Sequence, residues 1–146
     1  MRFKAKKKGM TQIYNKNGKI VPVTVVEVME EIDFEDISEN DEVKVTGATR
    51  GRGFAGVVKR YAFAGGPKTH GQSDRHRATG SIGGGSTPGR VWMGKKMPGH
   101  YGNEIKTITG LSIVKIEKDK KLVVVSGSIP GARKNIITVE VINEGK

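Results

Sequence analysis

The middle of the chain, from Tyr61 to Tyr101, has too few apolar side chains to form a core of its own. The wider stretch 49–103 holds 14 of the 21 glycines, ten Lys and Arg residues and one acidic residue, Asp74. Such a segment buries too little apolar surface to offset the entropy lost on folding. It follows neither the helical nor the strand periodicity. We therefore expect an irregular extension that a polyanion orders by neutralising its charge.

The remainder of the chain is rich in valine and isoleucine and predicts short β-strands. Asn15–Gly18 ends in Asn-Gly, a strong hairpin signal between two of them. The acidic stretch Glu30–Asn40 predicts at most one helical turn. Strands at this spacing are typical of a small barrel or sandwich, so we expect an all-β core from residues 1–60 and 103–146, with the extension at 61–102. The predicted strands are Met10–Tyr14, Ile20–Val28, Glu42–Thr46, a weaker Phe54–Lys59, Leu111–Glu117, Leu122–Val125 and Ile136–Ile142.

The overall charge narrows the class of partner. Lys and Arg number 26 against 15 Asp and Glu, which gives a formal net charge of +11. There is no cysteine, so disulfides and thiolate metal sites are excluded. No run of 18 apolar residues occurs, and we expect no membrane helix. We expect an intracellular protein with a polyanionic partner.

Clusters of basic residues are the strongest functional signal. Arginine offers a planar fork for phosphate oxygens and lysine a point charge. Nearby glycines allow the backbone to approach a phosphate chain, and interleaved aromatic rings can stack on unpaired bases. The predicted RNA-binding residues are Lys6, Lys7, Lys8, Arg50, Arg52, Lys59, Arg60, Lys68, His70, Arg75, His76, Arg77, Arg90, Trp92, Lys95, Lys96 and His100.

Other motifs carry weaker signals. The glycines of 51–56 match G-x-G-x-x-G, but the β-branched, basic residues that follow do not predict the helix that a dinucleotide site needs. The three histidines fit no standard zinc spacing and are better explained by contacts with bases, phosphate or ribose, or as solvated loop residues. No acid–base pair or clustered acids predict catalysis, so we expect neither an enzyme nor a cofactor or metal.

Several stretches, taken together and in order, resemble the universal large-subunit ribosomal protein L-three family. The resemblance is most specific between Thr46 and Asn103. The stretches that carry it are Gly9–Gln12, Val21–Val25, Val45–Gly56, Lys59–Arg60, Phe63–Gly71, His76–Arg77, Gly80–Gly83, Thr87–Arg90, Gly94–Met97, Gly99–His100 and Gly102–Asn103.

The resemblance implies a closed six-stranded barrel of the translation-protein type and an extension that enters large-subunit ribosomal RNA towards the peptidyl-transferase centre. It also implies a non-catalytic, cytoplasmic ribosomal component that binds early in assembly beside other large-subunit proteins, with no small-molecule substrate. Family members carry several tens of residues more between the strands near Val28 and Val43, where this chain has only Met29–Asp41. A free-standing RNA chaperone or nucleic-acid-compacting protein is the alternative, because it would use the same charge without one defined site.

Overall fold

The chain forms two units in the computed structural model, which describes residues 1–15, 18–69 and 71–142. Contacts group residues 1–50 with 103–146, here called the six-stranded unit, and set 51–102 apart as the basic unit. The boundary expected from the sequence lies after residue 60. The contacts instead assign the segment 51–60 to the basic unit.

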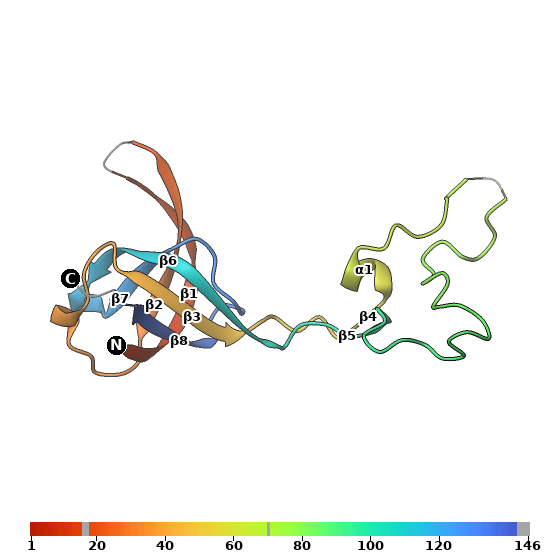
Figure 1. Cartoon of the computed structure of the whole chain (residues 1–146). Helices are drawn as coiled ribbons and strands as arrows, with labels where there is room; N and C mark the ends of the chain where they lie inside the picture. Colours follow the sequence, from red (N-terminus) through yellow and green to blue (C-terminus); the bar gives the residue numbers. More distant parts are fainter. Residues whose placement is uncertain (16–17, 70, 143–146) are drawn as a thin grey trace. The chain divides into compact units, whose positions relative to one another are not determined.

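Six antiparallel strands close on themselves in the six-stranded unit (Figure 1). Their spatial order is β1-β2-β7-β6-β3-β8, and β8 completes the ring by pairing with both β1 and β3. The mostly-β, closed architecture expected from the sequence is confirmed. The strands are β1 (Arg2–Tyr14), β2 (Ile20–Val28), β3 (Glu42–Ala48), β6 (Ile105–Glu117), β7 (Leu122–Ser126) and β8 (Ile136–Ile142).

Two strands begin earlier than the sequence predicts. The first strand starts at Arg2 rather than Met10, because Phe3 and Ala5 alternate inward although basic residues separate them. A register shift between Lys7 and Gly9 bends it against β2. The sixth starts at Ile105, and its first half pairs with β3 although its side chains are largely exposed.

The strand predicted at Phe54–Lys59 is wrong beyond its first two residues. Only Phe54–Ala55 forms a strand, β4, which pairs with β5 (Gly99–His100). The chain then turns into a short helix, α1 (Val57–Tyr61), which ends at Ala62 in the left-handed conformation with a φ of 57°. Local hydrogen bonding has overridden the β-propensity of two adjacent valines.

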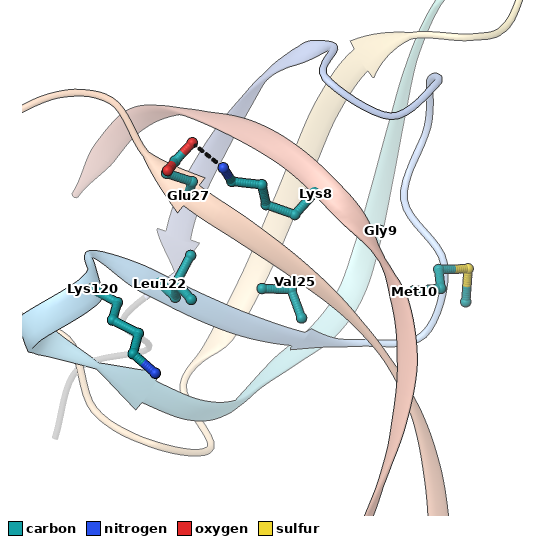
Figure 2. A pocket seen from close by; sticks show the side chains of 7 residues that line it. All are labelled: Lys8, Gly9, Met10, Val25, Glu27, Lys120 and Leu122. Atoms are coloured by element: carbon teal, nitrogen blue, oxygen red, sulfur yellow. Dashed lines mark ion pairs between the residues drawn. The ribbon is translucent and has the colours of Figure 1, made fainter.

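The outer face of the ring carries a shallow hollow where β1, β2 and β7 meet (Figure 2). Met10, Val25 and Leu122 line its apolar part. At its edge Lys8 Nζ lies 2.9 Å from Glu27 Oε2 in an ion pair between neighbouring strands. Both partners are more than a third exposed, so the pair adds little to stability.

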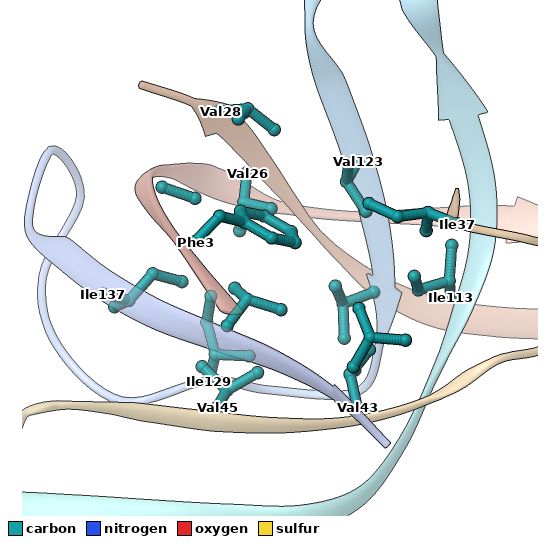
Figure 3. Close-up of a cluster of buried hydrophobic side chains, with 14 residues drawn as sticks. Phe3, Val26, Val28, Ile37, Val43, Val45, Ile113, Val123, Ile129 and Ile137 are labelled. Carbon is teal, nitrogen blue, oxygen red and sulfur yellow. The ribbon is translucent and has the colours of Figure 1, made fainter. Parts of the chain in front are cut away.

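The interior of the ring is filled by aliphatic side chains and one aromatic ring (Figure 3). Phe3, Val45, Ile113 and Val139 are almost completely inaccessible to solvent. They come from four different strands, so the core ties together segments that are far apart in the sequence. Burial of these side chains is the main stabilising contribution to the unit.

The connection 29–41 between β2 and β3 is short and is joined to this core. It holds one turn of 3-10 helix, Phe34–Asp36, in agreement with the single turn expected there. Ile37 is buried in the core, and Ile32 and Phe34 pack against it. The acidic side chains around them stay at the surface.

Candidate nucleic-acid interface

The basic unit begins with two chain segments held side by side. The amide of Arg52 donates to the carbonyl of Tyr101 over 2.8 Å, and the amide of Tyr101 donates to Gly53 over 2.9 Å. Arg52 Cζ also lies 5.4 Å from the centre of the Tyr101 ring. The rings of Phe54 and His100 meet edge to face at 6.0 Å. These contacts fix the outgoing and returning segments of the basic unit against each other.

Arg60, at the end of α1, fastens the helix to the returning segment. Its Nη1 donates to the carbonyl of Met97 over 3.0 Å. Its Cζ lies 5.1 Å from the ring centre of Tyr61, and Lys96 Nζ lies 5.7 Å from the same ring. The guanidinium fits here because Gly99 has no side chain: a Cβ there would lie 2.7 Å from Nη1. Two cations thus gather around one aromatic ring.

A second local contact joins 65–67 to 75–76. The amide of Gly66 donates to the carbonyl of His76 over 2.9 Å, and His76 Nδ1 lies 3.1 Å from the carbonyl oxygen of Pro67. A Cβ on Gly65 would overlap that His76 carbonyl, so only glycine permits the approach. This contact presents Arg75 and Arg77 as exposed side chains on either side of His76.

Almost nothing in the basic unit is buried. Among its described residues only Ala55 and Val57 are inaccessible, and both lie near its start. Trp92 is 59% exposed and Met93 99%. The extension therefore has local hydrogen bonds and turns but no core, as its composition predicts.

The cations of the basic unit have no acidic partners in the described part of the chain. All four ion pairs found there lie in the six-stranded unit. In the basic unit, cations face aromatic rings instead, as where Arg90 Cζ lies 5.1 Å from the centre of the Trp92 ring. Unpaired cations beside exposed rings suit phosphates and unstacked bases.

Most of the predicted contact residues are exposed or half-buried. Arg60 and His76 are half-buried and held by the contacts described above, and His70 lies outside the described residues. The exposed members of the basic unit are Arg52, Lys59, Lys68, Arg75, Arg77, Arg90, Trp92, Lys95, Lys96 and His100. The predicted residues of the six-stranded unit are Lys6, half-buried, Lys8, paired with Glu27, and the exposed Arg50.

Lys7 is the exception, and its prediction as an RNA contact is wrong. Its side chain points inward on β1 and is only 8% exposed. Its Nζ donates to the carbonyls of Ile129 and Gly131 over 2.7 and 2.9 Å. Burial, and then the charge of Arg50, lower the pKa of its ammonium group. Lys7 serves the fold, because its donors are already used.

Two cations that sequence reasoning missed lie beside it. Arg133 and Lys134 are exposed in the connection between β7 and β8. They are adjacent in the sequence and follow Gly131, so the signal of a basic pair beside glycine was available. Among the described residues no group of three or more His, Asp and Glu side chains is placed to hold a metal ion. No described helix has the length and apolar character to cross a membrane.

Comparisons with known proteins point in one direction. The family described as "Ribosomal protein L3" matches residues 1–122. The curated protein named "Large ribosomal subunit protein uL3" from Dehalococcoides mccartyi strain BAV1 is 51% identical over 118 residues, which cover 81% of this chain and 58% of that protein. Its namesake from Herpetosiphon aurantiacus is 48% identical over 122 residues, covering 84% and 52%. The one from Thermosipho melanesiensis is 47% identical over 119 residues, covering 82% and 58%. The chain thus spans little more than half the length of these relatives.

Proposed function

The chain belongs to the ribosomal protein L3 family, and on that premise we propose that it is a non-enzymatic component of the large ribosomal subunit. In this proposal it binds large-subunit ribosomal RNA in the cytoplasm, beside neighbouring ribosomal proteins. The ring of six strands is of the translation-protein type and lies on the RNA surface. The basic extension enters the RNA and reaches towards the peptidyl-transferase centre, and binding takes place early in subunit assembly.

One observation carries the proposal: the exposed cations of the basic unit are paired with no acid, whereas every ion pair of the described residues lies in the other unit. A polyanion is the partner that neutralises such a surface. The absence of a core from most of the extension supports the same partner, since the extension would exchange chain entropy for phosphate contacts and released counterions. Specificity would come from RNA shape and from bases stacked on rings such as Trp92.

Salt dependence and side-chain removal test this proposal. With roughly eight phosphate contacts, the affinity for large-subunit ribosomal RNA falls steeply with salt, with a log–log slope magnitude of about 5–7. Replacing Arg75, Arg77 or Arg90 by alanine weakens binding by about 1–3 kcal/mol each if the guanidinium is buried against RNA. A nearly flat salt response, or unchanged affinity in all three variants, would contradict it.

The alternative is a free-standing RNA chaperone or nucleic-acid-compacting protein. Its charge would act without one defined site, so excess unrelated RNA would displace it readily. A site-specific ribosomal protein instead keeps its RNA under that competition. Retention on the large subunit after a high-salt wash favours the ribosomal assignment in the same way.

A further inference from the structure

The connection between β7 and β8, residues 127–135, is held to the six-stranded unit through a single residue. The ammonium group of Lys7 donates to the carbonyls of Ile129 and Gly131. The amide of Lys7 donates to Asn135 over 3.0 Å, and the amide of Lys134 donates to the carbonyl of Lys7 over 2.7 Å. Ile129 is itself buried in the core. Four hydrogen bonds to one residue and a buried anchor give this surface loop a fixed shape.

The same loop packs closely against the end of β3. Gly131 has a φ of 92°, and a Cβ there would lie 2.9 Å from the carbonyl oxygen of Ala48. Arg50 follows two residues later and is exposed. Its charge is one of the two causes that lower the pKa of Lys7. Arg50 therefore acts in the same electrostatic environment as the loop.

Arg133 and Lys134 are presented outward by this fixed loop. The guanidinium of Arg133 lies over Gly9, where a Cβ would be 3.4 Å from its Nε. Lys134 has a φ of 70°, a conformation set by the hydrogen bond of its amide to Lys7. Neither residue, nor Arg50, takes part in an ion pair among the described residues. Three unpaired cations thus stand on backbone that is already ordered.

We propose that Arg50, Arg133 and Lys134 form a second phosphate-binding site, on the six-stranded unit and separate from the basic extension. Its ligand is the sugar-phosphate backbone of RNA, so the inference rests on the proposed function. Two arginine forks and one lysine suit phosphate oxygens of successive nucleotides. Lys7 is the positioning residue: it gives up its own charge to backbone carbonyls and thereby holds the cations on either side of it in place.

The ordered loop and the extension bind the same partner in different ways. The loop has its shape before RNA arrives, so its contacts cost little conformational entropy. The extension has no core and must lose chain freedom on binding. The loop therefore supplies contacts that first orient the six-stranded unit on RNA and that persist when the extension is impaired.

The test uses the full chain with the double substitution Arg133→Gln and Lys134→Gln. Its control is Lys118→Gln with Lys121→Gln, which removes the same charge from exposed positions at the opposite end of β7. Binding to in vitro transcribed large-subunit ribosomal RNA is measured over a range of salt concentrations, and thermal unfolding checks that both variants fold. The loop variant binds about tenfold more weakly at 0.1 M salt, and the magnitude of its log–log slope falls by about 1.4–1.8, which corresponds to two lost phosphate contacts. The control changes affinity by less than about twofold, as expected for a loss of net charge alone.

Equal affinity and equal slope in the loop variant and the control would overturn the second site. A loop variant that loses binding only to polyglutamate, with RNA binding intact, would also overturn it and assign the loop to an acidic protein. Failure of the proposed function looks different, because the unaltered chain would then show no preference for ribosomal over unrelated RNA. A third variant, Lys7→Met, shows the loop's dependence on its anchor: RNA affinity falls although no exposed charge has been removed.

Discussion

Arg60 and Met97 are joined by a hydrogen bond of 3.0 Å from the guanidinium Nη1 to the main-chain carbonyl oxygen. This bond connects the end of α1 to the segment that returns towards β5, across an intervening stretch without a buried residue. It exists because Gly99 leaves space for the guanidinium. A conformational feature of a glycine thereby decides where a cation of the proposed interface is held.

Replacing Gly99 by alanine is expected to displace Arg60. The new Cβ would lie 2.7 Å from Nη1, so the flexible side chain moves and its bond to Met97 is lost. The amide of Tyr101 then exchanges hydrogen faster, by about fivefold for a loss of about 1 kcal/mol. Exchange measured by NMR checks this. Gly83→Ala is the control, since nothing lies within 4 Å of a Cβ there; equal exchange in both variants would refute the role of Gly99.

Gly65→Ala is expected to weaken RNA binding through the backbone. Alanine at this position overlaps the carbonyl of His76, so the contact that presents Arg75 and Arg77 opens. Gly80 is a matched control, because both glycines have a φ of +76° and a Cβ at Gly80 meets nothing within 4 Å. Conformational strain is therefore common to the two variants. We expect affinity about fivefold lower for Gly65→Ala than for Gly80→Ala, equivalent to about 1 kcal/mol in a filter-binding assay.

Lys7→Met is expected to destabilise the six-stranded unit by about 1–3 kcal/mol. Methionine keeps the aliphatic stem but leaves the carbonyls of Ile129 and Gly131 without their donor. Lys6→Met, one residue earlier on the same strand and half-buried, should change stability by less than about 0.5 kcal/mol. Denaturant unfolding followed by circular dichroism compares them. Similar midpoints for the two variants would show that the buried ammonium group contributes nothing.

The pH dependence of stability provides an independent check on Lys7. Its pKa in the folded chain is below the model value of 10.5, because burial and the nearby charge of Arg50 disfavour the ammonium form. Between the folded and unfolded pKa the unfolded chain binds more protons, so the free energy of unfolding rises with pH in that window. This gain is complete above the unfolded pKa and is lost as pH falls through the folded pKa. The wild type should therefore gain stability relative to Lys7→Met as pH is raised towards 10.5; a constant difference would mean the pKa is not lowered.

Trp92→Ala should weaken RNA binding by about 1–3 kcal/mol without lowering the stability of the six-stranded unit. The ring is 59% exposed beside Arg90, so it is free to stack on an unpaired base. Met93→Ala removes an adjacent apolar side chain that is 99% exposed and has no ring. Affinity and unfolding midpoint are measured for both. If the methionine variant loses as much affinity as the tryptophan variant, apolar contact rather than stacking is responsible.

The sequence predicted the ring and the open extension better than it predicted individual basic side chains. Strands such as Ile20–Val28 and Ile136–Ile142 are predicted with their observed bounds because their apolar residues announce them. The start of β1 was missed because Lys7 occupies an inward position, which a binary pattern of apolar and polar residues reads as surface. The same residue was wrongly assigned to RNA for the same reason: its neutralisation depends on carbonyls more than 120 residues away.

Other features depend on contacts that no local pattern contains. Val57 and Val58 favour a strand, yet the backbone turns into α1 after Gly56, and the helix closes with Ala62 in the left-handed region. The order of the strands around the ring follows from which apolar faces meet in the core, and the alternation within a strand does not specify its neighbours. Arg133 and Lys134 were missed because their position beside Arg50 is created by the folded loop.

The order of strands in the ring constrains how a growing polypeptide can assemble. During synthesis, β1 and β2 emerge first and can form a hairpin, but β3 follows with neither of its neighbours, β6 and β8, yet made. All of residues 51–102 are translated before β6 begins at Ile105. The cationic segment thus leaves the exit tunnel while the domain that carries it is still incomplete, and a newborn molecule presents its charge to surrounding polyanions before it has a finished scaffold.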